Sequence, residues 1–386
     1  MLDAWAIDPE ITYLNHGTVG APPRRVLATQ QRIRDEIERH PSKFLLRELT
    51  GIGVGAPRAQ KPRMRAAADA VGEFLGARGD DIVFVDNVTA GINAVLRSFD
   101  FRADDEILIG SLAYGAIVNA ARYAARERGA HVRVVELPYP ATSSAAIADA
   151  YIGAIGPRTR MAIVDHITSE SALIFPLAQI AAACRARGVA VLADGAHAPG
   201  AIALDIPALG VDWYSANLHK WLYTPRSCGI LWAAPERQQG LHPTVISWGL
   251  DQGFAAEFDL VGTRDPSPHL AAPDGIAFLR ELGADAVRAY NHDLVWEAAR
   301  FLSARWGAAL GVPESMIGTM ATFALPAQLG ASAADAARLR DALLFEDRIE
   351  AQIHAARGGL WVRLSAQVYN EMSDYARLGD VIVARA

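Results

Sequence analysis

Short β-branched runs alternate with alanine-rich stretches from about residue 64 of this 386-residue chain, and this alternation restricts the fold more than any other feature. Strands are expected over Ile82–Val85, Glu106–Gly110, His131–Leu137, Met161–His166 and Val189–Ala193. Helices are expected around them, over Met64–Leu75, Ala90–Ser98, Gly115–Glu127, Ala145–Ile155 and Leu177–Arg187. Such alternation is typical of a mostly parallel sheet with helices on both faces. The sequence therefore predicts an α/β fold.

The two ends of the chain have a different pattern. Residues 1–62 show little periodicity apart from a charged helical stretch, Val26–His40. They also contain the glycine-rich run Gly51-Ile52-Gly53-Val54-Gly55. That run has the wrong spacing for a dinucleotide fingerprint and follows no expected strand, so a flexible loop is predicted there.

After a further apolar strand, Gly229–Ala233, the pattern changes near His269. Helices are expected over Ala272–Leu282 and Asp285–Gly307, with strands near Ala321–Leu325, Ala351–His354 and Leu360–Leu364. Helices on a small antiparallel sheet make a separate α+β unit. We therefore expect a large α/β domain over residues 21–268 and a small domain over 269–386, with residues 1–20 packing on the small domain.

Charge and composition argue against several classes of protein. The net charge is −6 without a basic tail, which disfavours a nucleic-acid partner. Cys184 and Cys228 are too few for a disulfide framework or a cysteine metal site. The start of the chain lacks a secretory signal pattern, and no apolar run reaches membrane-spanning length. A soluble cytoplasmic protein without a membrane partner is expected.

Lysine usage singles out one residue. Only three of the 37 basic side chains are lysines, namely Lys43, Lys61 and Lys220. Lys43 and Lys61 stand near prolines and resemble surface lysines, whereas Lys220 stands between His219 and Trp221 after an aromatic-polar strand. An amine can lose its proton and act as a nucleophile or base, which a guanidinium cannot. A solvated surface lysine is the alternative interpretation.

Polar residues follow the expected strands, where ligands of such sheets bind. The groups are Asn87-Val88-Thr89-Ala90-Gly91 after the first strand, Tyr114 after the second, Asp165-His166-Ile167-Thr168-Ser169 after the fourth and Asp194-Gly195-Ala196-His197 after the fifth. Tyr114 could stack on a flat ring or pack in the core. A binding site is expected among these residues.

The chemistry of an aldehyde cofactor that reacts with amino acids fits this set. It needs a lysine for the Schiff base, a carboxylate beside a pyridine nitrogen and donors for a phosphate. Lys220 and Asp194 can supply the first two. Thr89 with the free backbone N–H groups of Ala90 and Gly91 can supply the third, because a helix start is an anion site. Asp194 could instead cap a helix or a turn, and Thr89 could be an ordinary cap.

The ordered motifs resemble those of class V aminotransferases, pyridoxal-phosphate enzymes of fold type I. The cofactor signature is Asp194-Gly195-Ala196-His197 with Asn217-Leu218-His219-Lys220-Trp221. Further motifs are similar to the isopenicillin N epimerase-like branch: Tyr13-Leu14-Asn15-His16-Gly17, Tyr114-Gly115-Ala116, Asp165-His166-Ile167-Thr168-Ser169, Gly262-Thr263-Arg264-Asp265 and Trp361-Val362-Arg363-Leu364-Ser365. The resemblance runs from about residue 10 to the end. It implies a mostly parallel seven-stranded central sheet and a smaller C-terminal α+β domain.

The resemblance also implies roles for the matching residues. Lys220 would form the Schiff base with pyridoxal 5′-phosphate and then shuttle protons. The other cofactor-binding residues would be Thr89, Ala90, Tyr114, Ser169, Asp194, His197, Asn217, His219 and Thr263. Asn15, His16 and Arg363 would bind the amino-acid substrate, with Arg363 as a bidentate clamp for its carboxylate.

Within the cofactor set, the resemblance places Asp194 at the pyridine nitrogen and Tyr114 on the ring. His197 would lie beside the phenolic oxygen, where Ser169 replaces an asparagine used by many relatives. Phosphate would be bound by Thr89, Asn217 and His219. Thr263 is similar to a residue that reaches the phosphate of the neighbouring subunit, which implies a homodimer with shared active sites.

Three other interpretations have less support. A metal site is disfavoured because His166, His197 and His219 lie on separate elements without a His-Glu-x-x-His motif. A dinucleotide-dependent oxidoreductase should show its fingerprint at Asn87–Gly91, which does not match. A cofactor-binding protein without catalysis would not need the set of Lys220, Asp194 and Arg363.

Fold and cofactor do not determine the reaction. Lys220 is best placed to take an α-proton. The carbanion could then be epimerised, lose a β-thiol in C–S lysis, or be transaminated. Epimerase-like chemistry is preferred on the motifs, although no second acid–base group opposite Lys220 is assignable. A β-eliminating cysteine-conjugate or sulfoxide lyase, or an aminotransferase, is the alternative.

Two further expectations concern the substrate. Persulfide-type cysteine desulfuration is disfavoured, because Met316–Arg363 contains no cysteine. The substrate side chain has no readable code, and only the loops Arg39–Arg58 and Thr244–Asp259 could shape its pocket.

Overall fold

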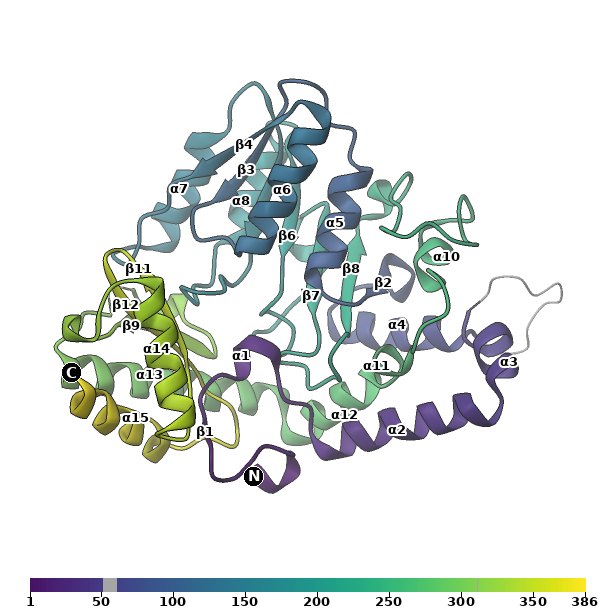
Figure 1. The fold of residues 1–386 in the computed structure, drawn as a ribbon. Helices are drawn as coiled ribbons and strands as arrows, with labels where there is room; N and C mark the ends of the chain where they lie inside the picture. The colour runs from purple at the N-terminus through teal and green to yellow at the C-terminus, as the bar shows by residue number, and fades with distance from the viewer. Residues whose placement is uncertain (51–60, 311) are drawn as a thin grey trace.

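The computed structural model describes residues 1–50, 61–310 and 312–386, and its largest sheet has seven strands in the order β2-β8-β7-β6-β5-β3-β4 (Figure 1). The strands are β2 (Ile82–Val85), β3 (Glu106–Gly110), β4 (His131–Val135), β5 (Thr159–Asp165), β6 (Ala190–Asp194), β7 (Trp213–Asn217) and β8 (Gly229–Ala233). β8 is antiparallel to both of its neighbours, and the other neighbouring pairs are parallel. The predicted mostly parallel, seven-stranded sheet is confirmed.

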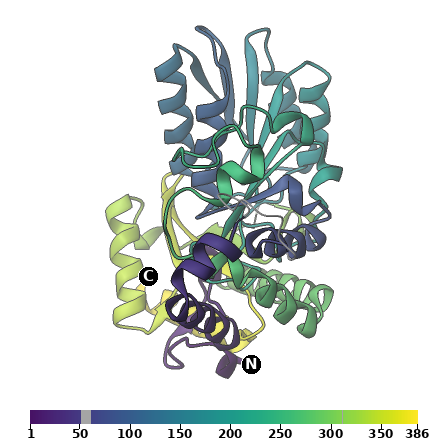
Figure 2. The same cartoon turned by 90° about the vertical axis from the view of Figure 1, so that its right-hand side faces the viewer.

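Helices cover both faces of this sheet because successive side chains of a strand point to opposite faces. Ile107 and Ile109 of β3 pack in one cluster with α5 (Val88–Ser98) and α6 (Gly115–Arg128). Leu108 packs in the cluster of the opposite face. The helices of that face are α4 (Arg63–Phe74), α7 (Ser144–Ala154) and α8 (Leu177–Arg185). Figures 1 and 2 show the sheet between these two helical layers.

A second, three-stranded antiparallel sheet, in the order β11-β12-β9, forms the core of the C-terminal region. Its strands are β9 (Met320–Ala324), β11 (Gln352–Ala356) and β12 (Gly359–Ser365). The helices in the same hydrophobic cluster are α13 (Ala284–Trp306), α14 (Ala333–Phe345) and α15 (Met372–Arg385). The sequence pattern had missed α14 and α15. The two predicted domain boundaries stay predictions.

The N-terminal segment joins the C-terminal region through a two-stranded parallel sheet. β1 (Thr12–Tyr13) pairs with β10 (Ile349–Glu350), and Leu14 is fully buried in the C-terminal cluster. The remaining helices are α1 (His16–Val19), α2 (Arg24–Arg39), α3 (Pro41–Lys43), α9 (Ile206–Leu209), α10 (Phe254–Asp259), α11 (Ser267–Leu270) and α12 (Ala272–Leu282). The N-terminal segment is therefore held in place by the C-terminal region of the chain.

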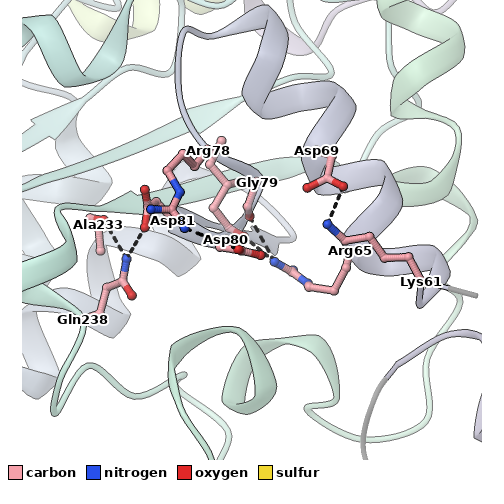
Figure 3. A network of polar contacts seen from close by, with 10 residues as sticks. Lys61, Arg65, Asp69, Arg78, Gly79, Asp80, Asp81, Ala233 and Gln238 are labelled. Carbon is pink, nitrogen blue, oxygen red and sulfur yellow. Dashed lines mark hydrogen bonds and ion pairs between the residues drawn. The ribbon is translucent and has the colours of Figure 1, made fainter. Parts of the chain in front are cut away.

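A buried ion pair between Arg65 and Asp259 lies at the amino end of β2, and Figure 3 shows the Arg65 side chain directed at Gly79. Arg65 of α4 donates from Nε to Asp259 Oδ2 over 2.7 Å, and its Nη2 donates to the other oxygen of the same carboxylate. Its Nη1 donates to the carbonyl oxygens of Gly79, at 3.2 Å, and Ile82, at 2.8 Å. Each nitrogen of this guanidinium thus has a partner within the chain.

Some sequence expectations fall outside this description. The predicted Gly51–Gly55 loop and the end of the predicted Arg39–Arg58 loop lie beyond the described residues. No helix of the described part is both long and apolar enough to cross a membrane.

Candidate active site

The carboxyl ends of the central strands border a cavity of about 560 Å³ that also contacts β11 and β12. Nine of the predicted site residues line it: Thr89, Tyr114, Ser169, Asp194, His197, Asn217, His219, Lys220 and Arg363. Side chains from the start, middle and end of the chain therefore meet where ligands of parallel sheets bind.

Lys220 lies in this cavity just beyond β7, in contact with a histidine. Its Nζ is 3.0 Å from Nε2 of His197, whose Nδ1 is 3.5 Å from the indole nitrogen of Trp221. An indole N–H can only donate, so Nδ1 of His197 is the acceptor and Nε2 carries the hydrogen. His197 then donates to Lys220, which requires a neutral amine.

The electrostatics of the cavity agree with this assignment. Burial, reinforced by the positive charge of Arg363, lowers the pKa of Lys220 to about 7, and Asp194 opposes that shift. Burial also lowers the pKa of His197 well below its usual value, with further contributions from Lys220 and Arg363. His197 is therefore neutral at neutral pH, and the neutral amine of Lys220, which a nucleophile requires, becomes the major form above pH 7.

Asp194 ends β6 beside a second carboxyl group that the sequence analysis gave no role. Its register partner on the neighbouring strand is Asp165, and both line the cavity. Oδ1 of Asp194 accepts the Ala196 N–H over 2.9 Å. Burial and the proximity of Asp194 raise the pKa of Asp165 well above its usual range, because two adjacent carboxylates cannot both ionise cheaply. Burial raises the pKa of Asp194 as well.

The start of α5 offers fewer donors than expected. The N–H of Ala90 donates to the side-chain oxygen of Asn87 over 3.0 Å. The N–H of Gly91 donates to the backbone oxygen of Asn87 over 3.3 Å. The expectation that the Ala90 and Gly91 N–H groups are free is therefore wrong, because Asn87 is the helix cap and satisfies them. Ala90 does not line the cavity. The Thr89 N–H and hydroxyl are the donors that this helix start offers an anion.

Asn217 and His219 border the same end of the cavity. The side-chain oxygen of Asn217 accepts the Val88 N–H over 2.9 Å, which joins the end of β7 to the start of α5. Nδ1 of His219 donates to the carbonyl oxygen of Cys228 over 3.0 Å. Burial lowers the pKa of His219 to about 4, so in this state its free Nε2 is an acceptor. An anion beside it would favour the protonated ring.

Arg363 of β12 lies at the opposite side of the cavity and is only 3% exposed. It donates to the carbonyl oxygen of Ser169 over 2.7 Å, to Thr18 Oγ1 over 2.6 Å and to Asn15 Oδ1 over 3.2 Å. Its Nε is buried without a partner among the described residues. Burial lowers its pKa to about 10, and Glu170 opposes the shift. The hydrogen bonds of the guanidinium thus go only to neutral oxygens, and one N–H group has no partner among the described residues.

Asn15 and His16 lie behind the cavity wall rather than on it. Asn15 supports Arg363 and is itself held by Glu350 at 2.7 Å. His16 is fully buried, and its Nε2 donates to the backbone oxygen of Lys220 over 2.7 Å. Both residues therefore position groups of the cavity, and direct substrate contact stays a prediction.

Gly20 explains how α1 approaches the lysine so closely. Its φ of +66° is a left-handed conformation, and a Cβ there would stand 1.8 Å from the His219 carbonyl oxygen. A glycine is required at this crossing. The N-terminal segment thereby holds the turn that presents Lys220.

Two of the predicted site residues, Tyr114 and Thr263, are exposed. Tyr114 is 47% exposed at the start of α6, where its ring borders the cavity. Thr263 does not line this cavity; it borders a separate hollow with Leu45 and Leu46. Contact of Thr263 with a second subunit stays a prediction.

A family model described as aminotransferase class V matches residues 56–340. The chain belongs to the class V aminotransferase family. Enzymes of this family depend on pyridoxal phosphate, so the expectations of an enzyme and of this cofactor are confirmed at the level of the family.

Individual relatives of this chain carry two kinds of name. It is 32% identical over 396 residues to isopenicillin N epimerase of Streptomyces clavuligerus, covering 98% of this chain and 96% of the relative. It is 33% identical over 404 residues to "Probable L-cysteine desulfhydrase, chloroplastic" of Arabidopsis thaliana, covering 97% and 83%. The solved complex of the cystine C–S lyase C-DES with cysteine persulfide has a TM-score of 0.79 at 21% identity, covering 97% of both chains. This last likeness confirms the fold.

The residues of this cavity fit the cofactor of the family. A neutral amine at Lys220 suits an aldehyde, and the buried carboxyl group of Asp194 suits a pyridine nitrogen. The Thr89 donors suit a phosphate. The unpartnered Nε of Arg363 suits a substrate carboxylate. Among the described residues, no three His, Cys, Asp or Glu side chains converge as metal ligands would.

Four further residues of the cavity had no role in the sequence analysis: Thr18, Asp165, Glu170 and Gln352. Thr18 follows the recognised Asn15-His16-Gly17 motif, so its position beside Arg363 was within reach of the motif. Gln352 pairs in register with Arg363 on the neighbouring strand, a contact that no local pattern reveals.

Proposed function

We propose that this class V aminotransferase removes the α-proton of an L-amino acid with Lys220 and then eliminates a sulfur substituent from the β-carbon. With L-cysteine and water as reactants, the products of this β-elimination are sulfide, pyruvate and ammonia. The bound cofactor would supply an electron sink for the charge at the α-carbon. The chain has to supply a base near that carbon and an anchor for the carboxylate.

The contact between Lys220 and His197 carries the proposal. His197 donates to Nζ at 3.0 Å, and the pKa of Lys220 is lowered to about 7, so the amine can take a proton near neutral pH. Arg363 lines the cavity and has a buried Nε without a partner among the described residues, so it can hold the carboxylate and fix the α-hydrogen relative to the base. One base is sufficient for elimination.

Sulfur would leave directly as sulfide rather than through a protein persulfide. Cys184 and Cys228 are both fully buried, and burial raises their pKa values to about 11 and about 12. The reactive form of cysteine is the thiolate, which these surroundings disfavour. Neither thiol is suited to accept a sulfur atom.

Epimerisation is the second candidate, supported by the 32% identity to isopenicillin N epimerase over nearly the whole chain. It would need a second acid–base group across the α-carbon from Lys220. In the part of the chain that the structure describes, no residue has contacts that assign it to this role. We therefore rank elimination first, in contrast to the preference from sequence motifs.

The two reactions differ in their products, and one incubation separates them. Holoenzyme is mixed with L-cysteine in heavy water, and sulfide, pyruvate, α-deuterium and the D-enantiomer are measured. Equal amounts of sulfide and pyruvate support elimination. Deuterated D-cysteine without pyruvate would contradict it and favour epimerisation. Lys220→Ala should abolish both signals, whereas Lys61→Ala, which removes an exposed lysine paired with Asp69, should abolish neither.

We further propose that the active unit is a homodimer in which Thr263 completes the partner's site. Thr263 is exposed and lies outside its own cavity, which supports this reading. If Thr263→Ala lowers activity, mixed dimers of Thr263→Ala and Lys220→Ala chains should recover it, because one of the two sites then has both residues. Failure to recover activity in mixed dimers would exclude a shared site. The cytoplasmic location stays a prediction.

A further inference from the structure

A second pocket, of about 270 Å³, adjoins the active-site cavity and shares Glu170 with it. We call it the distal pocket, and its argument rests on five lining residues: Glu136, Tyr139, Glu170, His354 and Arg357. They come from the segment after β4, the loop after β5, and the end and turn of β11. None of them belongs to the predicted cofactor or substrate set.

The register of β11 connects the two pockets. Gln352 lines the active-site cavity and pairs with Arg363, while His354, two residues further, lines the distal pocket. Residues two apart on a strand share a face and are separated by roughly 7 Å. The distal pocket therefore begins about the length of an amino-acid side chain away from Arg363, the proposed clamp for the substrate carboxylate.

Two buried polar atoms of the distal pocket lack partners among the described residues. They are the Tyr139 hydroxyl and Nδ1 of His354. Buried polar groups normally have hydrogen-bond partners, and leaving them unpaired costs stability. Burial lowers the pKa of His354, so its ring is neutral and one nitrogen accepts a hydrogen bond. The Tyr139 hydroxyl can accept from a ligand at the pocket, and Nδ1 of His354 can do so in the tautomer that carries its hydrogen on Nε2.

The charges of the distal pocket are predominantly negative. Glu136 and Glu170 are exposed and have no ion-pair partner among the described residues, while the charge of Glu170 also acts on His354 and Arg363. Arg357 is the one cationic side chain of the lining, and its guanidinium lies 5.6 Å from the centre of the Tyr139 ring. Two unpaired carboxylates and two free acceptors together suit a group that carries several N–H donors.

We propose that the distal pocket binds the far end of the substrate side chain and selects a distal ammonium group. This inference rests on the proposed function, because it places the α-carbon between Lys220 and Arg363. An ammonium has three donors and a positive charge, which match Glu136 and Glu170 together with the acceptors of Tyr139 and His354. The preferred substrates are then S-substituted cysteines of about lysine length with a terminal amine.

A matched pair of compounds tests this selection. S-(2-aminoethyl)-L-cysteine and S-propyl-L-cysteine have the same number of heavy atoms and differ in the terminal ammonium, and S-(carboxymethyl)-L-cysteine carries a negative charge. Dissociation constants are read by stopped flow from the first change in cofactor absorbance of the holoenzyme, before turnover. We expect the aminoethyl compound to bind about tenfold or more tightly than the propyl compound, in line with one hydrogen bond to a charged group. Equal binding, or tighter binding of the propyl or carboxymethyl compound, would overturn the proposal.

Variants locate the selection in the distal pocket. The double variant Glu136→Gln and Glu170→Gln keeps the side-chain shapes, and it should bring the ratio of the two dissociation constants close to one. Glu297→Gln, at an exposed carboxylate of α13, should keep the wild-type ratio. A preference that survives in the double variant would contradict the assignment. Because binding is read before turnover, an enzyme that binds all three compounds but exchanges no α-proton would refute the proposed function and leave the binding ratio as the test of the distal pocket.

Discussion

Arg65 and Arg363 are both buried, and their surroundings differ in kind. Arg65, 9% exposed, forms a paired hydrogen bond with the carboxylate of Asp259, and its third nitrogen bonds two backbone carbonyls. Arg363, 3% exposed, meets only neutral oxygens and has a buried Nε without a partner in the described chain. The charge of Arg65 is paired with a carboxylate, and each of its guanidinium nitrogens has a hydrogen-bond partner. The charge of Arg363 has no carboxylate hydrogen-bonded to it, and its Nε has no partner in the described chain.

The lysines repeat this contrast. Lys61 forms an exposed ion pair with Asp69 (Figure 3), whereas Lys220 is held by His197 in a form that favours the neutral amine. Buried charge costs free energy unless it is paired. Buried ionisable side chains without a charged partner therefore indicate a ligand-binding site. Here these side chains lie at the carboxyl ends of the strands.

Replacing Lys220 should have the largest effect. Lys220→Ala removes the amine that we propose as cofactor ligand and base, so α-proton exchange should fall by about 10⁴-fold or more. Exchange is followed by NMR in heavy water. Lys61→Ala is the matched control and should stay within about twofold of wild type, since an exposed ion pair contributes about 1 kcal/mol or less. Comparable losses in both variants would remove the distinction between the two lysines.

Replacing Arg65 should mainly affect stability. Arg65→Met leaves the Asp259 carboxylate buried without its partner, so the free energy of unfolding should fall by about 3–5 kcal/mol. Urea unfolding of the apoprotein measures this change. The same substitution at Arg363 leaves only neutral oxygens behind and should cost clearly less. If Arg363→Met were the more destabilising change, the division into a structural and a binding arginine would be wrong.

Replacing Arg363 should mainly affect substrate binding. Arg363→Met keeps the length of the side chain and removes the carboxylate clamp, so KM for L-cysteine should rise by about 100-fold, as for loss of a bidentate charged hydrogen bond. Steady-state sulfide release measures it. Cofactor absorbance should stay at the wild-type value, because the proposed role of Arg363 is to bind the substrate carboxylate. A change in absorbance with unchanged KM would place this arginine on the cofactor instead.

The sequence predicted the site better than it predicted the contacts within it. Strand periodicity located the carboxyl ends, so Asp194 and Tyr114 were found from local pattern. The Ala90 donor was predicted wrongly, because a cap by Asn87 depends on a side-chain conformation that no spacing reveals. The position of Thr18 beside Arg363 spans 345 residues along the chain. Such contacts follow from packing of the whole fold.

The same reasoning applies to the pair of carboxyl groups and to the two helices that the sequence pattern missed. Asp165 appeared in a quoted motif, yet its closeness to Asp194 depends on the register of two neighbouring strands. Helices α14 and α15 were missed even though their lengths are ordinary. The alanine-rich start of α14, Ala333 onward, gives a weak amphipathic pattern, and tertiary packing decides such cases.

The pH dependence of cofactor attachment gives the smallest effect and the closest test of the Lys220 surroundings. Burial lowers the pKa of Lys220 from the ordinary 10.5 to about 7, so the nucleophilic amine is the major form above pH 7. Attachment to the apoprotein, followed by absorbance, should therefore be about tenfold slower at pH 6 than at pH 8, with a plateau above pH 8. Between pH 7 and 10.5 the unfolded chain binds the proton more strongly, so the contribution of this group to stability should rise with pH across that window and vanish in Lys220→Ala. Lys61→Ala should follow the wild-type curves. A rate that keeps rising to pH 10 would mean that the protein does not hold Lys220 as a neutral amine, and the contrast between the two lysines would lose its physical basis.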